Sequence, residues 1–323
     1  MRLDQPRAVE ITREKKGRSV EKFVAEPCTT DRYFLGECCR WDEVRGELYW
    51  VDVHEGHFFR ATADHTTIDV VHRYDLEGNV SALAPLVDRN DGWIVAMNQS
   101  LYLLSESGQL REVAQLEEDA VMLLNDGAAD PWGSFWVGSL AADEEPNRGS
   151  VYRFGPSSGV QRMFGGATVS NGIGWSLDRT TLYYVDSGPG TITSYDVGGH
   201  GEISGPRLFA HFDTATEGTP DGLCIDSEGF LWVAVWGGYE VRRYAPTGEL
   251  VARVSVSTAQ PSCCAIGGAN GTTLYITTAQ EDLPASKLDN EPEAGRLFAV
   301  NVDVKGRPLD PYRPFQQLSA DGA

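Results

Sequence analysis

The stretch "SNGIGWSLDRTTLYYVDS", residues 170–187, returns in altered form as "PDGLCIDSEGFLWVAVWG", residues 220–237. Each copy starts near an Asn-Gly or Asp-Gly pair, continues as a short apolar run, turns, and ends in a second apolar run with aromatic residues. Short runs rich in Val, Ile, Tyr and Trp between turn residues are typical of β-strands. The two stretches therefore predict a repeated unit built on a pair of strands.

The same unit recurs along most of the chain. The centre of its second strand falls at Trp50, Ile94, Trp136, Tyr184, Trp232 and Tyr275. A repeat of roughly 40 to 50 residues, with short strands cut by turns and no sustained helical period, is typical of a β-propeller blade. Six copies predict an all-β chain that forms a six-bladed β-propeller with four-stranded blades.

The two ends of the chain bear on how the ring closes. After "AGRLFAVNVD", residues 294–303, the last repeat lacks a clear fourth strand and continues into the Pro-rich "GRPLDPYRPF". We expect "VEKFVAEP", residues 20–27, to supply the outer strand of the last blade, because this removes an open sheet edge. Residues 1–19 are polar and locally basic, which predicts a flexible N-terminal extension before one propeller domain over residues 20–323.

Composition narrows the possible partners. The 323 residues carry a formal net charge of −20 and are 41% hydrophobic. This charge disfavours nucleic acid and anionic membranes as partners. No run is long and apolar enough for a membrane helix, and no secretory h-region is present, so a cytoplasmic location is expected. The six cysteines lack CxxC spacing and are expected to be buried thiols, and the sequence does not indicate an oligomeric state.

Each repeat carries an oxygen-bearing side chain four residues before the anchor of its first strand. The six positions are Glu37, Ser81, Asn125, Asn171, Asp221 and Ser262. Because the first strand of every propeller blade lines the central axis, these residues are expected to form a ring at one depth in the channel. All except the two serines offer carboxylate or amide oxygens, which suit Ca²⁺, Mg²⁺ or Mn²⁺, with Zn²⁺ as a further candidate.

A turn is the alternative interpretation of the Asn-Gly and Asp-Gly pairs, since both are common turn dipeptides. Turn residues belong between strands, however, whereas these precede the inner strand at one register. Glu37 shares that register although no glycine follows it. The register therefore favours a metal site over a set of turns.

The motifs "LGECCRWDEVRGELYWVDV", "LNDGAADPWGSFWVGSL" and "PSCCAIGGANGTTLYITTA", together with the two stretches quoted first, resemble a known family. They are similar to successive blade motifs of the senescence-marker-protein/gluconolactonase family, over roughly residues 30 to 303. The resemblance implies a six-bladed propeller that hydrolyses aldonolactones with one catalytic divalent metal. It implies Glu37, Asn171 and Asp221 as metal ligands. It also implies Asn125 near metal and substrate, and Asp221 as the candidate general base.

Two departures from the family pattern concern the substrate. Leu123 stands where animal lactonases of the family have an arginine, and Asp143 corresponds by position to a glutamate that helps to hold the substrate. Loss of a guanidinium removes a bidentate donor for sugar hydroxyls, and Asp is one methylene shorter than Glu. The identity of the lactone is therefore left open.

Chemical reasoning on the ring leads to the same reaction class. A cation held by three or four protein oxygens keeps open positions for a water molecule and an ester carbonyl. Asp221 is the candidate proton acceptor, and no GxSxG elbow or Ser-His-Asp set competes with it. Two alternatives stay open: a phosphotriesterase or other ester hydrolase on the same metal site, and a non-enzymatic propeller that binds a partner protein.

Overall fold

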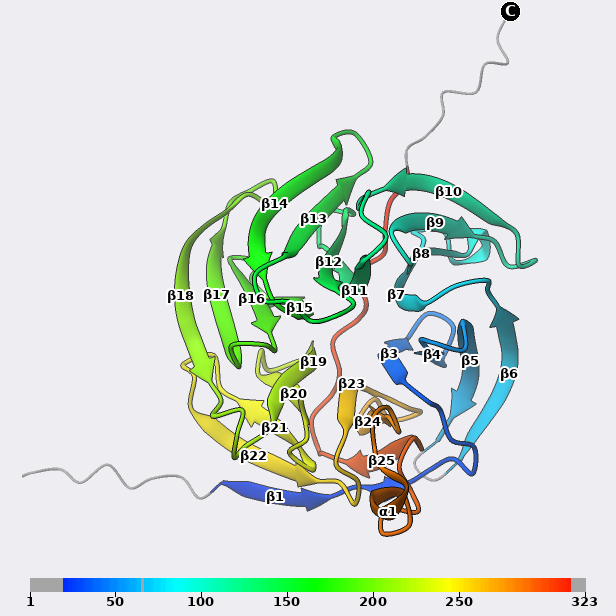
Figure 1. The fold of residues 1–323 in the computed structure, drawn as a ribbon, viewed down its shortest axis with the longest axis vertical. Coiled ribbons are helices and arrows are strands. Elements are labelled where there is room, and N and C mark those ends of the chain that lie inside the picture. Colours follow the sequence, from blue (N-terminus) through cyan, green and yellow to red (C-terminus); the bar gives the residue numbers. More distant parts are fainter. Residues whose placement is uncertain (1–19, 65–66, 315–323) are drawn as a thin grey trace, which may run out of the picture.

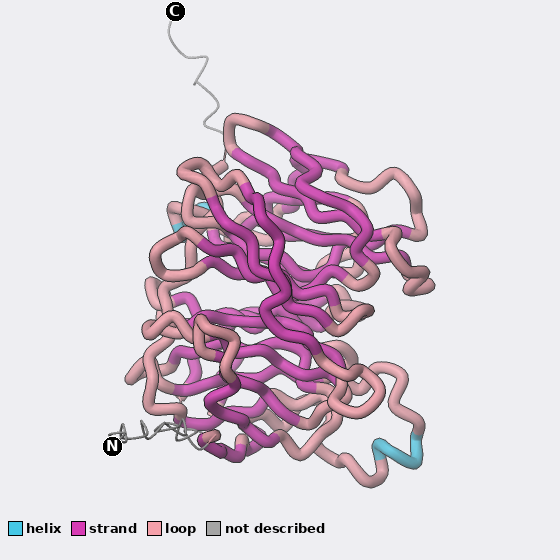
Figure 2. Tube along the Cα trace, turned by 90° about the vertical axis from the view of Figure 1, so that its left-hand side faces the viewer, coloured by secondary structure: helices cyan, strands magenta, loops and turns pink. Residues whose placement is uncertain are grey.

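The computed structural model describes residues 20–64 and 67–314 and forms a ring of six sheets around a central axis (Figure 1). Seen from its edge, the ring is a disk with strands through its thickness and loops at both faces (Figure 2). The prediction of an all-β, six-bladed propeller is confirmed. The N-terminal extension predicted for residues 1–19 lies outside the described residues. In the described ranges, no helix is long and apolar enough to cross a membrane.

The blades follow one another along the chain, each from its inner to its outer strand. Blade 1 contains β3 (Gly36–Asp42), β4 (Glu47–Asp52), β5 (His57–Ala63) and β6 (Ile68–Asp75). Blade 2 contains β7 (Val80–Pro85), β8 (Trp93–Met97), β9 (Ser100–Leu104) and β10 (Leu110–Gln115). Blade 3 contains β11 (Met122–Ala129), β12 (Phe135–Ala141), β13 (Gly149–Gly155) and β14 (Gly159–Ala167).

The second half of the ring repeats this order. Blade 4 contains β15 (Ser170–Trp175), β16 (Thr181–Asp186), β17 (Thr191–Val197) and β18 (Ile203–His211). Blade 5 contains β19 (Thr219–Ile225), β20 (Leu231–Trp236), β21 (Glu240–Tyr244) and β22 (Leu250–Ser255). Blade 6 contains β23 (Pro261–Gly267), β24 (Thr273–Thr278) and β25 (Phe298–Asn301), with the short helix α1 (Ala285–Leu288) between the last two strands.

The N-terminal segment is shared between two blades. β2 (Glu26–Pro27) pairs with β25 as the outer strand of blade 6, whereas β1 (Glu21–Val24) pairs in parallel with β22 and adds a fifth strand to blade 5 (Figure 1). The sequence predicted that residues 20–27 supply the outer strand of the last blade, but only Glu26–Pro27 pair there, and Glu21–Val24 pair with blade 5 instead. Ala25, between the two strands, is buried and donates its N–H to Ser255, which fixes the crossing from blade 5 to blade 6.

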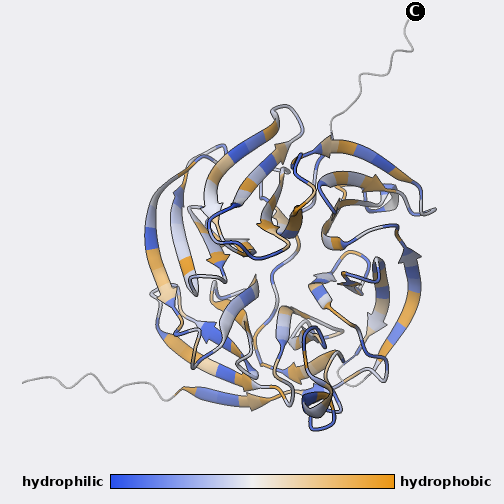
Figure 3. Ribbon diagram, viewed as in Figure 1, coloured by the Kyte–Doolittle hydropathy of each residue, from blue (hydrophilic) through white to orange (hydrophobic). Residues whose placement is uncertain are grey.

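Aromatic side chains fill the spaces between blades. Trp50, Trp136, Trp175 and Trp232 are at most 2% exposed. Across the boundary of blades 3 and 4 the rings of Trp136 and Trp175 meet edge to face, with centroids 5.7 Å apart. Polar and apolar residues are mixed along the outer strands (Figure 3), whereas strands nearer the axis, such as β8, are buried along their whole length, so each sheet buries both faces against its neighbours. All six cysteines are free, and all except the half-buried Cys224 are buried.

Buried aspartates anchor the turns that follow two inner strands. One carboxylate oxygen of Asp130 and of Asp226 accepts backbone N–H groups of its own turn. The other oxygen accepts an indole N–H and an arginine of the same blade, from Trp136 and Arg153 in blade 3 and from Trp232 and Arg243 in blade 5. Both aspartates are fully buried, and these bonds offset the cost of removing their charge from water.

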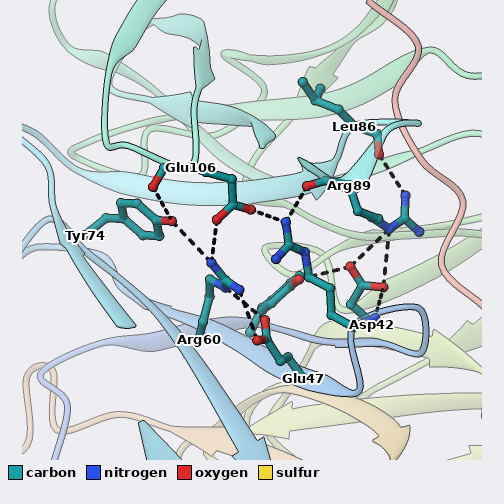
Figure 4. Close-up of polar contacts among 9 residues, drawn as sticks. Asp42, Glu47, Arg60, Tyr74, Leu86, Arg89 and Glu106 are labelled. Carbon is teal, nitrogen blue, oxygen red and sulfur yellow. Dashed lines mark hydrogen bonds and ion pairs between the residues drawn. The ribbon is translucent and has the colours of Figure 1, made fainter. Parts of the chain in front are cut away.

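A network of charged side chains joins blades 1 and 2 (Figure 4). Arg60 donates to Glu47 at 2.9 Å within blade 1 and to Glu106 of blade 2 at 2.8 Å. Arg89 of blade 2 pairs with the buried Asp42 of blade 1 at 3.1 Å. These pairs fix blade 1 against blade 2, and Asp42 ends the inner strand β3 next to Glu43, which the C-terminal segment contacts.

Residues 303–314, here called the C-terminal strap, cross the ring near the ends of the inner strands (Figure 1). The strap contacts all six blades, through Glu43, Pro85, Gly133, Trp175, Asp226 and Gly271 in chain order. Its Tyr312 is 2% exposed and stacks on Phe154. Because the ring positions lie at the starts of the inner strands, the strap and the predicted site are at opposite ends of the channel.

Candidate active site

Every inner strand contains a β-bulge at its predicted ring position. In blade 5 Pro220 pairs with Val235 and Leu223 pairs with Val233, so three steps along β19 match two along β20. The other five inner strands shift register between Glu37 and Arg40, Val80 and Ala82, Leu124 and Gly127, Ser170 and Ile173, and Pro261 and Cys263. A bulge re-aims a side chain relative to the sheet. The predicted ring residues thus occupy equivalent, irregular places in their strands.

The glycines after Asn171 and Asp221 serve close packing near the axis. Both pairs lie within strands, β15 and β19, and not in turns. A Cβ at Gly172 would lie 2.8 Å from the carbonyl oxygen of Asp221, and one at Gly222 would lie 2.6 Å from the sulfur of Cys263. Neighbouring inner strands can therefore approach only because side chains are absent at these two positions.

Hydrogen bonds between blades hold the ring positions in place. The Asn125 Nδ2 donates to the Ser170 carbonyl of blade 4 at 2.9 Å. The Asn171 Nδ2 donates to Ser187 at 3.0 Å, and Ser187 donates to the Pro220 carbonyl of blade 5 at 2.7 Å. These bonds use the amide nitrogens of both asparagines. Their side-chain carbonyl oxygens remain available to a ligand.

Glu37, Asp126 and Asp221 bring three carboxyl groups together from three blades. Burial, and then the charge of Asp126, raise the pKa of Glu37 to about 8. Burial, and then the charges of Glu37 and Asp126, raise the pKa of Asp221 well above its usual range, which the nearby Asn171 amide partly offsets. Among the residues that the structure describes, the Asp221 Oδ1 and the Asp126 Oδ2 are buried and have no hydrogen-bond partner. Buried charge of one sign without full compensation fits a site for a cation.

The oxygen chemistry of this group bears on the predicted metal. Within residues 20–64 and 67–314, no three His, Cys, Asp or Glu side chains are placed to hold a metal ion as a group. The predicted ligand set contains only two such residues, Glu37 and Asp221, and adds the amide oxygen of Asn171. Hard oxygen donors of this mixed kind, one of them unpartnered, are compatible with a divalent cation. The metal itself stays a prediction.

Arg40 and Asp126 belong to the channel but were missed from the sequence. The Arg40 Nη2 donates to the Asp126 Oδ1 at 3.0 Å, and both residues are less than a tenth exposed. Asp126 was detectable, because "LNDG" in blade 3 has a carboxylate where blades 4 and 5 have the glycine after the ring residue. Nothing in the local pattern around Arg40 indicates that its side chain crosses to blade 3.

The loops at the start of the inner strands form the entrance to the ring. Asp143 lies on the loop after β12 with an exposed side chain, and its described contacts are with the Glu145 N–H and with Arg148 at 4.0 Å. Leu123 is half-buried in β11, where it pairs with Leu140. Neither of these two predicted substrate-binding residues is directly bonded to a ring residue in the described structure.

A histidine at this entrance was not expected from the sequence. His54 follows β4, and its Nε2 lies 2.5 Å from the Glu281 Oε1, a contact that raises the pKa of His54. The charge of Glu281 also raises the pKa of Glu37, which places this pair within electrostatic reach of the ring. His54 carried no signal in the sequence because it lies outside the ring register.

Comparison with known proteins identifies relatives over most of the chain. The family model described as SMP-30/Gluconolactonase/LRE-like region matches residues 35–280. The 6-deoxy-6-sulfogluconolactonase of Pseudomonas putida is 33% identical over 284 residues, which cover 84% of this chain and 92% of that protein. The L-arabinolactonase of Azospirillum brasilense is 34% identical over 279 residues, with 85% and 91% covered.

A solved structure has the same architecture. The regucalcin of Agrobacterium tumefaciens, named as a calcium-binding protein, superimposes with a TM-score of 0.83 at 28% sequence identity. The match covers 91% of this chain and 99% of the regucalcin chain. The six-bladed ring is thus shared along almost the whole length of both proteins.

Proposed function

This chain belongs to the SMP-30/gluconolactonase/LRE-like family, and on that premise we propose that it is a divalent-metal-dependent lactonase that opens the ester ring of a sugar lactone. Two relatives at 33% and 34% identity are lactonases by name, and each aligns with more than four fifths of this chain. The observation that supports the proposal is the ring itself, where Glu37 and Asp221 come together from different blades and neither forms an ion pair with a basic side chain of residues 20–64 or 67–314.

Glu37, Asn171 and Asp221 would hold the cation, with Asn125 beside it. The free Oδ1 of Asp221 and the amide oxygen of Asn171 supply hard ligands, and two carboxylates balance the charge of one divalent ion. Ca²⁺ is the first expectation, since the regucalcin relative is named as calcium-binding, and Zn²⁺, Mn²⁺ and Mg²⁺ are alternatives.

The chemistry required is the addition of water to an ester carbonyl. A bound divalent cation would polarise that carbonyl and acidify a nearby water molecule. Asp221 accepts the proton of the attacking water, and the proton then passes to the alkoxide oxygen as the ring ester bond breaks. The product is the open-chain hydroxy acid. Asn125, whose nitrogen is fixed by Ser170, accepts a hydrogen bond from a substrate hydroxyl through its carbonyl oxygen.

Two residues near the entrance to the ring are proposed to select the substrate. Leu123 is an apolar residue of β11, two positions before Asn125, and Asp143 lies on an exposed loop that can approach a bound sugar. We assign both to substrate binding. The neutral or acidic character of these residues favours a lactone recognised by its hydroxyl groups.

A panel of substrates tests the proposal. Five- and six-membered aldonolactones, aryl esters and phosphotriesters are offered to the metal-free protein and to protein loaded with Ca²⁺, Mn²⁺ or Zn²⁺, and acid release is followed. Hydrolysis of at least one aldonolactone that depends on the cation is expected. Turnover of aryl esters or phosphotriesters alone would assign the site to another ester hydrolase. Absence of turnover on every substrate would favour a binding module.

A further inference from the structure

The residues three positions after each ring residue differ in size between the blades. The six residues at this offset are Arg40, Ala84, Ala128, Gly174, Cys224 and Ala265, and all except Ala265 line the cavity described below. Five blades thus contribute a small side chain, and blade 1 contributes an arginine. The small residues leave room on the axis that a long side chain can cross, and the contacts of Arg40 show that it does so.

The Arg40 guanidinium spans from blade 1 to blades 3 and 6. Its Nη2 donates to the Asp126 Oδ1 at 3.0 Å and to the Gly127 carbonyl at 3.1 Å. Its Nη1 donates to the Cys39 carbonyl at 2.9 Å and contacts the Cys263 sulfur at 3.2 Å. With these contacts and an exposure of 7%, the group is committed to the protein and is not a donor for substrate.

Arg40 also separates the ring from a cavity. A cavity of about 100 Å³ lies between Arg40 and the C-terminal strap, and its lining includes Ala84, Ala128 and Gly174, three of the small residues at this offset. Arg40 therefore forms the floor of the ring. A smaller side chain there would join the ring to this cavity.

The charges of Arg40 and Asp126 affect the ionisation of the ring carboxyl groups. Asp126 raises the pKa of both Glu37 and Asp221, whereas Arg40 lowers the pKa of Glu37. Without Arg40 the group would contain three carboxylates and no cation of its own. With Arg40 paired to Asp126, the carboxyl groups of Glu37 and Asp221 remain, and their charge once both are ionised equals that of one divalent ion.

We propose that Arg40 is a positioning residue that, by pairing with Asp126, sets the charge of the ring to suit a divalent cation and closes the channel beneath it. This inference rests on the proposed cation site. Arg40 acts through Asp126 and not by contact with substrate. Its removal should therefore tighten the binding of a cation to the ring, and removal of the Asp126 charge should weaken it.

A double-mutant cycle tests the proposal. Calorimetric titrations of CaCl₂ and MnCl₂ compare the metal-free wild type with Arg40→Met, Asp126→Asn and the double variant. Coulomb interactions at this depth predict that Asp126→Asn weakens cation binding about tenfold or more, because Arg40 is then uncompensated. Arg40→Met should tighten it by a similar factor. The double variant, which removes both charges, should return to within about threefold of the wild type.

A matched control uses a buried pair outside the channel. Arg153→Met combined with Asp130→Asn removes a pair with the same 3.0 Å separation, and should lower the melting temperature while cation affinity stays unchanged. If Arg40→Met does not fold, the double variant still decides, because it removes both charges of the pair and leaves neither one buried alone.

The outcomes separate this inference from the proposed function. A wild type that binds the cation while all the Arg40 and Asp126 variants keep its affinity would make Arg40 a structural plug and overturn the inference alone. A wild type that binds neither cation would overturn both the proposed function and the inference that rests on it.

Discussion

Asp226 and Asp221 are the same kind of residue, at opposite ends of the inner strand of blade 5, and both are buried. Asp226 is surrounded by donors: two backbone N–H groups of its turn, the Trp232 indole and the Arg243 guanidinium. Asp221 has one oxygen without a hydrogen-bond partner in the described part of the chain, and the charges of two acids, Glu37 and Asp126, raise its pKa. Both carboxylates are buried, but only that of Asp226 has hydrogen-bond donors for both of its oxygens.

This difference separates residues that stabilise the fold from residues that await a ligand. A buried carboxylate with a full set of donors stabilises the chain by itself, whereas one among like charges destabilises it until a cation binds. Blade 3 repeats the contrast within one segment, since Asp130 is fully bonded and Asp126 depends on an arginine from another blade. The predictions below test whether the two classes respond differently.

The largest expected effect is on catalysis. Asp221→Asn keeps the volume and an oxygen ligand but removes the proton acceptor, so turnover should fall by roughly two to four orders of magnitude even when the metal is saturating. Initial rates on the best aldonolactone, measured across a metal titration with occupancy monitored, give the result. Glu37→Gln is the matched comparison, and should recover more of its activity as the metal concentration rises. Turnover near wild type in metal-saturated Asp221→Asn would leave Asp221 as a ligand at most.

The next effect is on stability, at the opposite end of the same strand. Asp226→Ala leaves Arg243, the Trp232 indole and two turn N–H groups without their acceptor, and should lower the free energy of unfolding by about 3 kcal/mol. Chemical denaturation measures this loss. Turnover per folded molecule should stay near wild type, because Asp226 lies at the strap end of the channel. A loss of turnover without a loss of stability would contradict the division into two classes.

The smallest effect concerns pH. Burial and neighbouring acids raise the pKa of Glu37 to about 8 and raise the pKa of Asp221 well above its usual range, so protons compete with a cation for these carboxyls. A cation must displace those protons, and its affinity should therefore rise with pH by up to about tenfold per unit for each proton released. Titration calorimetry in buffers of different ionisation enthalpy measures the release. Equal affinity at acidic and neutral pH, with no proton released, would contradict the unpartnered state of the ring acids.

The sequence predicted the ring more readily than its floor, for a physical reason. A bulge in one inner strand alone would have shifted that strand out of register with the others. All six inner strands carry a bulge near the same position. Counting four residues back from the apolar anchor of each first strand therefore still finds equivalent residues. The pairing of Arg40 with Asp126 depends on how three blades meet at the axis. No local period contains that information.

The two ends of the chain show the same limit. One run at residues 20–27 was expected to form one strand, but Ala25 is buried where the chain passes from blade 5 to blade 6, and the run is divided there. The C-terminal strap has no strand pattern because its prolines interrupt backbone donors. Its place across the channel is set by contacts to all six blades, which become visible only in the folded ring.

The central claim is that the ring acids await a cation, and binding stoichiometry tests it most directly. Calorimetric titration of Ca²⁺ and of Mn²⁺ into the metal-free protein, with the melting temperature followed at each addition, should give one bound cation per chain and a melting temperature that rises with its concentration. A variant with both Glu37→Gln and Asp221→Asn should show neither, while Asp226→Ala should bind as the wild type does. A wild type without bound cation and with an unchanged melting temperature, or a double variant that binds equally well, would contradict the account.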